Sequence, residues 1–217
     1  SMDVNKKSII EYSYRNDTGD AQALVYHLFP GVEVAYISVH MTDFDFGLFE
    51  QGMLKNYVSI HFCKEGRIEQ QMNDEFFYLM PGDCSFAIHH KTQQMFHLPL
   101  KHYHGICINI DLNIEHNPLL EYIRSFDCPL EDALQHICGG MSHIVLRSSN
   151  AAKKFFYDLY DIDVDQRLSY LKAKMPELFF RMKYAKTNSI PYIFYISTFL
   201  LIVNNLCHSF FYVGATK

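Results

Sequence analysis

Histidines in the middle of this 217-residue chain are the residues best suited to chemistry, because imidazole binds metal ions and exchanges protons near neutral pH. His102 and His104 are separated by one residue, so on a β-strand they share a face and could coordinate one metal ion. His89 and His90 are adjacent, so a continuous strand would point them to opposite faces. The seven residues after His104 include no glutamate, and no later histidine has a matching spacing. We therefore expect ordinary hydrogen-bonded strand histidines, with no metal and no cofactor.

Other catalytic arrangements are weaker still. Asp83-Cys84 follows a turn and could expose a thiol, but no base is implied at a useful spacing. The chain has no G-x-S-x-G, no phosphate-binding Walker loop and no G-x-G-x-x-G. We do not expect an enzyme.

A ligand pocket is the functional interpretation that the strands favour. Residues 55–64 alternate with period two, which places Ser59 and His61 on one face and Ile60 and Phe62 on the other. A small barrel that holds one effector is lined by a few polar groups among aromatic ones. The opposite assignment stays open, with the Ser59 and His61 face outside and wet. The candidate ligand-binding residues are His61, Glu69, Gln71, His89 and Tyr103.

Short strands separated by turns precede the helices. Strands are predicted over residues 55–64, 67–72, 75–80, 84–89 and 102–111. Glu65-Gly66, Asn73-Asp74 and Pro81-Gly82-Asp83 supply the turns between them. No helical pattern lies between these strands, so the sequence predicts an antiparallel barrel or sandwich and excludes a parallel α/β sheet.

Helices are predicted after the strands. Asn117 caps the first, with Pro118 at its first position, and a second covers residues 129–138 before Gly139-Gly140. Asn150 is the expected cap of a third helix, and Asp165 of a longer fourth. Pro176 interrupts that fourth pattern, so a kink or break is predicted there.

The last segment, residues 189–216, contains no charged side chain. A membrane span needs about 20 apolar residues, and Asn204-Asn205 and His208 interrupt this run, so we favour a buried or dimer-facing helix. Lys183 and Lys186 before it would fit a cytoplasmic flank, which keeps a membrane helix as the alternative.

Composition limits the partners and the compartment. Hydrophobic residues make up 49% of the chain and charged residues 20%, which is enough for a sizeable core. The net charge of −5 is not that of a free-standing DNA-binding protein, so no direct nucleic-acid binding is expected. The six cysteines form no C-x-x-C pair, so we expect buried thiols and a cytoplasmic protein.

Two stretches carry a family resemblance. NYVSIHFCKEGRIEQQMNDEFFYLMPGDCSFAIHHK and FHLPLKHYHGICINID, followed by FYDLYDIDVDQRLSYLKAK, resemble the sensor part of bacterial transcription regulators of the AraC family. The resemblance implies an α+β fold, a cupin-like antiparallel β-barrel or sandwich followed by a helical C-terminal part. It implies a cupin-like sensor domain over residues 5–113, a helical dimerisation or linker region over 114–186 and an apolar tail over 187–217.

The resemblance also implies a function. Such regulators continue with two helix-turn-helix units, which place recognition helices in the DNA major groove, and nothing after Lys174 resembles them. We therefore expect a truncated regulator, a module that senses an unknown small-molecule effector and forms a homodimer without binding DNA itself. Four leucines and the tail could supply the dimer surface: Leu159, Leu168, Leu171 and Leu178. The alternative is a cupin-like metalloenzyme that uses His102 and His104.

Overall fold

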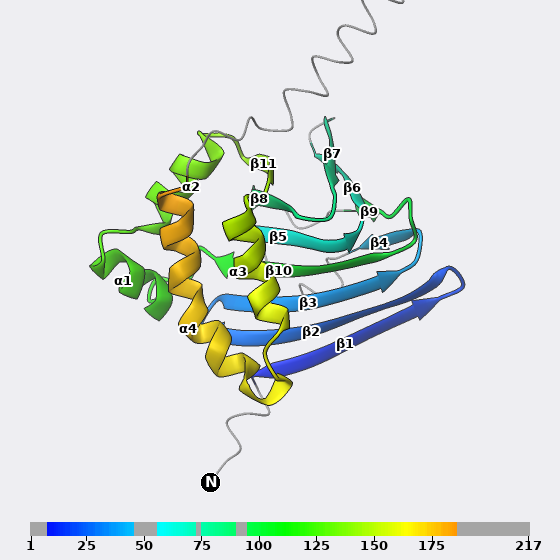
Figure 1. Cartoon of the computed structure of the whole chain (residues 1–217), viewed down its shortest axis with the longest axis horizontal. Coiled ribbons are helices and arrows are strands. Elements are labelled where there is room, and N and C mark those ends of the chain that lie inside the picture. The colour runs from blue at the N-terminus through cyan, green and yellow to red at the C-terminus, as the bar shows by residue number, and fades with distance from the viewer. Residues whose placement is uncertain (1–7, 46–55, 73–74, 90–94, 186–217) are drawn as a thin grey trace, which may run out of the picture.

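The computed structural model describes residues 8–45, 56–72, 75–89 and 95–185, and its helices lie against one face of a long sheet (Figure 1). The larger sheet has seven strands, in the order β1-β2-β3-β10-β5-β8-β11, and all neighbours are antiparallel. Its strands are β1 (Ile9–Asn16), β2 (Gly19–Phe29), β3 (Val32–His40), β10 (Tyr103–Asp111), β5 (Tyr57–Gly66), β8 (Asp83–His89) and β11 (His143–Arg147).

A smaller sheet has four antiparallel strands, in the order β4-β9-β6-β7. These are β4 (Asp43–Asp45), β9 (Met95–His97), β6 (Ile68–Met72) and β7 (Glu75–Leu79). The strands predicted between residues 55 and 111 are thus all present, within two residues at each end. The predicted Asn73-Asp74 turn lies outside the described residues.

Both faces of β5 are buried, which settles the face assignment that the sequence left open. Val58, Ile60 and Phe62 belong to a core between the large sheet and the helices. Ser59 and His61, on the opposite face, are also buried, at 1% and 5% exposure. That second face meets a core between the two sheets, so neither face of this strand is wet.

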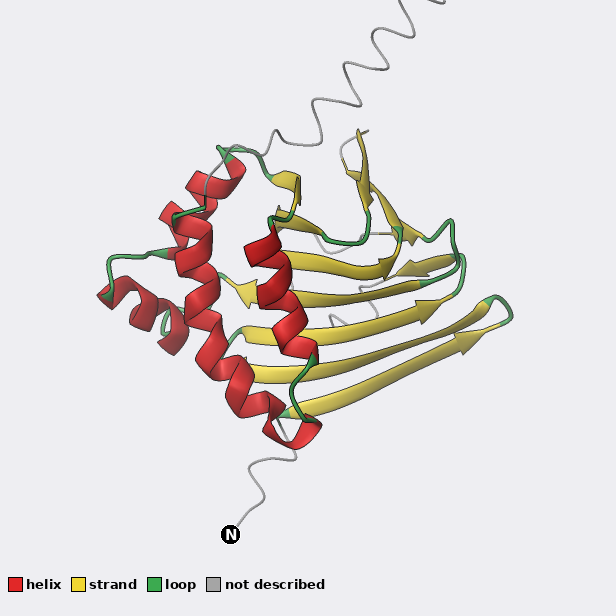
Figure 2. Cartoon of the chain, viewed as in Figure 1, coloured by secondary structure: helices red, strands yellow, loops and turns green. Residues whose placement is uncertain are grey.

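Four helices cover part of the large sheet on its outer face (Figure 2). They are α1 (Pro118–Ser125), α2 (Leu130–Cys138), α3 (Asn150–Tyr160) and α4 (Val164–Lys183). Asn117 caps α1, where its side chain accepts from the backbone of Leu119 and Leu120, and α2 ends at Gly139 in the left-handed conformation, both as predicted. The cap of α3 is Ser149 rather than Asn150, and α4 begins at Val164 with Asp163 before it rather than at Asp165.

The predicted break at Pro176 is wrong. Helix α4 continues through this proline from Val164 to Lys183. Proline removes one backbone hydrogen bond in a helix interior. Buried side chains on both sides of it, including Met175, Leu178 and Phe179, hold the helix against the core. Tertiary packing therefore overrides the local cost.

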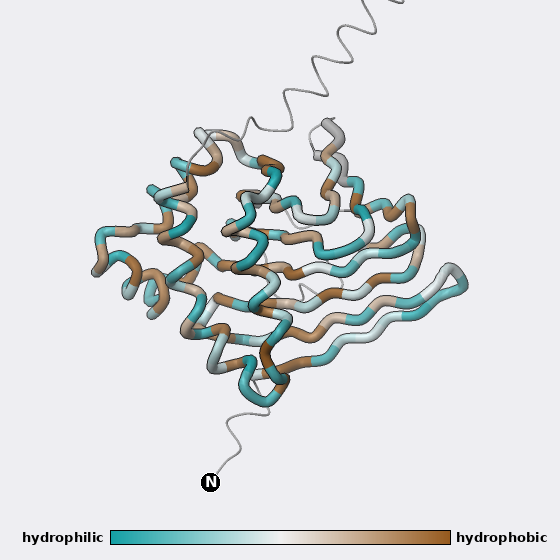
Figure 3. The backbone as a smooth tube through the Cα atoms, in the orientation of Figure 1, coloured by the Kyte–Doolittle hydropathy of each residue, from teal (hydrophilic) through white to brown (hydrophobic). Residues whose placement is uncertain are grey.

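Strand β11 joins the large sheet from within the segment predicted as helical. Its residues pair with β8 in antiparallel register, so Val145 lies opposite Ser85. The α+β class, with an antiparallel β-sandwich followed by a helical part, is confirmed, and it takes the form of two packed sheets. Hydrophobic and hydrophilic residues alternate along the strands and helices (Figure 3), as expected for elements with one buried face.

No helix within the described residues is long and apolar enough to cross a membrane. The uncharged segment 189–216 lies outside those residues. The five cysteines within them, Cys63, Cys84, Cys107, Cys128 and Cys138, are buried thiols outside any disulfide, as expected.

Candidate functional site

A small cavity lies between the two sheets. The small sheet contributes four apolar side chains to it: Ile68, Phe77, Leu79 and Phe96. The large sheet contributes His61, Ser85, His143 and Val145. Its volume is about 10 Å³, which is roughly the room that one water molecule needs. The lining thus pairs an apolar wall with a wall that carries polar groups.

Buried polar side chains gather on the inner face of the large sheet around this cavity. They come from four adjacent strands and are Ser59, His61, Ser85, Asn109 and His143, each at most 6% exposed. Burying a polar group in an apolar interior costs free energy unless it is hydrogen-bonded. Two of these side chains, His61 and Asn109, have contacts with the Cys107 thiol.

Polar contacts continue from the cavity to the surface. The His61 Nε2 atom lies 3.5 Å from the Cys107 Sγ atom, and this thiol donates to Asn109 Oδ1 at 3.2 Å. Asn109 Nδ2 in turn donates to Glu33 Oε1 at 3.4 Å. The other Glu33 oxygen lies 3.4 Å from His27 Nδ1, and the His27 side chain is 41% exposed. We call these five residues the inner polar chain.

Two members of the inner polar chain, His61 and Glu33, have shifted pKa values. Burial lowers the pKa of His61 from about 6.5 to about 4, and the nearby His143 adds to this effect. Burial raises the pKa of Glu33, while the Asn109 hydrogen bond and His27 oppose the rise. His61 is therefore neutral at pH 7, so it can both donate and accept a hydrogen bond.

The predicted ligand-binding residues are placed differently from one another. His61 lines the cavity. Tyr103 is fully buried in the core between the sheets, outside the cavity lining. Ile68, the neighbour of Glu69, lines the cavity, and the Glu69 carboxylate pairs with Arg67 at 2.8 Å. The side chains of Gln71 and His89 lie outside the described residues, although their backbones belong to β6 and β8.

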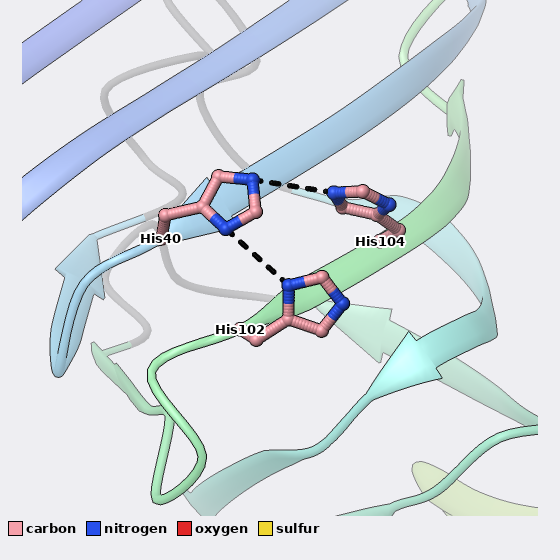
Figure 4. Close-up of side chains that lie close together, drawn as sticks. All are labelled: His40, His102 and His104. Carbon is pink, nitrogen blue, oxygen red and sulfur yellow. Dashed lines mark hydrogen bonds between the residues drawn. The ribbon is translucent and has the colours of Figure 1, made fainter.

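A cluster of three histidines lies on the opposite, outer face of the large sheet (Figure 4). His40 Nδ1 is 3.3 Å from His102 Nδ1, and His40 Nε2 is 3.3 Å from His104 Nε2. One nitrogen from each ring can be chosen so that all three lie within 4.8 Å of one another. We call His40, His102 and His104 the histidine cluster.

Strand register explains why the histidine cluster forms. Strands β3 and β10 are antiparallel neighbours, with Ser38 opposite His104. The same alternation places the next pair on this face, His40 at the end of β3 and His102 one residue before β10. On the other side of β10, Glu65 of β5 lies opposite His104. Its Oε2 atom is 3.6 Å from His102 Nε2 and 3.8 Å from His104 Nδ1.

The sequence found two members of the histidine cluster and missed the third. His40 is separated from His102 by sixty-two residues, so no local spacing could connect them. The sequence also raised Cys84 as a nucleophile. Its thiol is buried, and burial raises its pKa to about 12, which opposes formation of the reactive thiolate at neutral pH.

Comparison with known proteins gives structural similarities only. No family model and no curated protein matches the chain. An AraC-like transcriptional activator, CuxR, is similar with a TM-score of 0.40 and 11% identity, over 78% of this chain and 61% of that one. This chain thus spans about three fifths of the length of CuxR.

Two further similar structures cover less of this chain. The EutQ protein of Clostridium difficile has a TM-score of 0.31 and 16% identity, over 42% of this chain and 71% of its own. KdgF from Halomonas sp. has a TM-score of 0.35 and 14% identity, over 50% of this chain and 90% of its own. Similarities of this extent assign no function to this chain.

Proposed function

We propose that this chain is a sensor module that binds a small polar molecule between its two sheets. The observation that carries the proposal is the set of three buried polar side chains that line the inter-sheet cavity, His61, Ser85 and His143. His61 is central to it, because it lines the cavity and begins the inner polar chain. A few polar groups in an otherwise apolar concave site are typical of small-molecule binding.

Binding has to enlarge the cavity, because about 10 Å³ holds no more than a water-sized molecule. The small sheet is the wall that can move, because its side chains at the cavity are apolar and carry no hydrogen-bonding group. We therefore expect β6 and β7 to move away from β5, β8 and β11 when the effector binds.

Strand β5 would transmit that movement to the helices. His61 faces the cavity, and its neighbour Phe62 faces the opposite way and stacks on Phe156 of α3. A displacement of β5 would therefore change the position of α3 on the large sheet. Coupling between an effector site and a distant surface requires a contact of this kind that differs between two states.

The sequence resemblance supports a regulatory context for this module. We propose that it belongs to a regulator of the AraC type and forms a homodimer through its helices. Leu159, Leu171 and Leu178, which were expected at the dimer surface, are instead buried in the chain's own core. The exposed aromatic side chains of the helical part are better suited: Tyr122, Phe126 and Tyr184, at 52%, 53% and 68% exposure.

Binding rather than catalysis is the role we propose. The cavity-lining residues include no cysteine, carboxylate or lysine that could act as a nucleophile, among the residues that the structure describes. The lowered pKa of His61 makes it a weak base.

A thermal-stability screen tests the proposal. The full chain is screened against small polar metabolites, and each hit is titrated by calorimetry into three proteins: wild type, His61→Leu and His116→Leu. His116 is a matched control, since its side chain is 89% exposed, contacts Glu121 and does not line the cavity. We expect a hit whose affinity falls at least tenfold in His61→Leu and is unchanged in His116→Leu. Equal affinities in all three proteins would contradict a site at His61.

A further inference from the structure

The geometry points to a second site: we propose that the histidine cluster on the outer face binds one divalent first-row transition-metal ion. This site is separate from the inter-sheet cavity. His104 and Ser38 share the face that carries the helices, whereas Tyr103, between His102 and His104 in the sequence, is buried in the inter-sheet core. Failure of either site leaves the other intact.

The nitrogen positions already resemble a coordination shell. Zinc is held by imidazole nitrogens at about 2.0–2.1 Å, so the ligand atoms of a tetrahedral site are about 3.3 Å apart. The two closest nitrogen pairs of the cluster, His40 with His102 and His40 with His104, are each separated by 3.3 Å. Because these two contacts use different nitrogens of His40, a rotation of that exposed ring is needed to bring three nitrogens onto one ion.

Glu65 lies beside the histidine cluster and orients two of its rings. Its carboxylate contacts His102 Nε2 and His104 Nδ1, the ring nitrogens that do not contact His40. Carboxylates often hold metal-binding imidazoles in place in this way. Three imidazoles form a donor set that suits zinc, nickel, copper and cobalt, with water as the remaining ligand, whereas magnesium and calcium prefer oxygen ligands alone.

The supporting structure is rigid and open to solvent. The three histidines lie on β3 and at the start of β10, with Glu65 on the neighbouring β5, and the hydrogen-bonded register of these strands fixes the spacing. The Ser38 hydroxyl lies 2.9 Å from His104 Nε2 and 3.2 Å from His40 Nε2, so it orients both rings. His102 and His104 side chains are 36% and 31% exposed, which gives an ion access. The helices lie over the other end of the sheet (Figure 1).

Zinc titration of the full chain tests this site. The protein is prepared without a polyhistidine tag, stripped with a chelator and titrated with Zn²⁺ by calorimetry. Co²⁺ is used in parallel, because its visible absorption reports tetrahedral coordination. The variants are His40→Ala, His104→Ala and Glu65→Gln, and His116→Ala is the control, an exposed histidine paired with Glu121 rather than with other histidines.

We expect one zinc ion per chain and a tetrahedral Co²⁺ spectrum. His40→Ala and His104→Ala should each weaken zinc binding at least tenfold and remove the spectrum, Glu65→Gln should weaken binding less, and His116→Ala and wild type should behave alike. A circular-dichroism spectrum establishes that each variant is folded. Either an absence of stoichiometric binding, or binding that is unchanged in both histidine variants, overturns the proposal.

Discussion

Phe62 stacks face to face on Phe156, with ring centroids 4.5 Å apart and ring planes inclined by 3°. Both side chains are fully buried, and they join the central strand β5 to helix α3. His61, the neighbour of Phe62, faces the inter-sheet cavity. One strand thus contacts the proposed effector site on one face and the helices on the other.

Removing one ring of the stacked pair should destabilise the protein strongly. Phe156→Ala should lower the free energy of unfolding by about 3 to 5 kcal/mol, because it deletes a buried ring and leaves a cavity. Chemical denaturation measures this difference. Tyr122→Ala is the control, since that ring is half exposed, and it should cost less than about 1 kcal/mol. Equal costs would mean that the α3 contact does not hold the sheet.

His61 should make stability depend on pH. Burial depresses its folded-state pKa to about 4, so between about pH 6.5 and pH 4 the unfolded chain binds a proton that the folded chain does not. Stability due to this group is therefore complete above about pH 6.5 and is lost as the pH falls, by about 3 kcal/mol in all.

The His61 contribution is isolated by comparing wild type with His61→Gln. Urea unfolding at pH 7.5, 6.0 and 5.0 measures both proteins. Wild type should lose more stability than His61→Gln over this range, since glutamine does not titrate. Parallel losses in the two proteins would show that His61 is not the group responsible.

Replacing Pro176 should stabilise the protein. It lies inside α4 and provides no backbone N–H, so Pro176→Ala should raise the free energy of unfolding by about 2 kcal/mol. Ala173→Gly, at an exposed position of the same helix, should lower it by about 1 kcal/mol. Thermal and chemical unfolding measure both. A stability of Pro176→Ala at or below wild type would argue against a continuous α4.

Any side chain at position 105 should collide with the Tyr103 ring, so only glycine fits there. A Cβ atom added at Gly105 would collide with the Tyr103 side chain, which lies across this position on the same strand face, and with the backbone of Phe62. Gly105→Ala should therefore cost about 1 to 3 kcal/mol through overpacking.

A double-mutant cycle identifies the partner in that collision. In a Tyr103→Leu background the cost of Gly105→Ala should fall by about 1 kcal/mol, since the obstructing ring is gone. Additive costs would assign the strain to the backbone of Phe62 instead.

The sequence predicted the elements because local signals specify them. Period-two alternation identified β5 and β10, and Asn117 with Pro118 identified the start of α1. It missed β11, a five-residue strand within the helical part whose only sheet partner, β8, is over fifty residues away. The sequence wrongly predicted a break in α4 at Pro176, because helix propensity is a local property. The packing that keeps this helix continuous involves residues distant in the sequence.

The candidate site could be predicted only in part. His61 was predicted as a ligand-binding residue from its strand face. Its neighbours Cys107 and His143 follow from the order of strands in the sheet, which the sequence does not give. His102 and His104 were paired by spacing, and His40 could not be added without the β3–β10 pairing. Sequence spacing gives neighbours within a strand, and neighbours across a sheet need its topology.

The central claim is that a small molecule binds between the two sheets, and hydrogen exchange tests it most directly. Amide exchange of the full chain is measured with and without the metabolite that stabilises it most. The account predicts changed protection in β6 and β7, in the facing strands β5, β8 and β11, and in α3, with none in the exposed turn between β1 and β2. Changes confined to the outer face around His40 and His104, or to the helix surfaces alone, would contradict it.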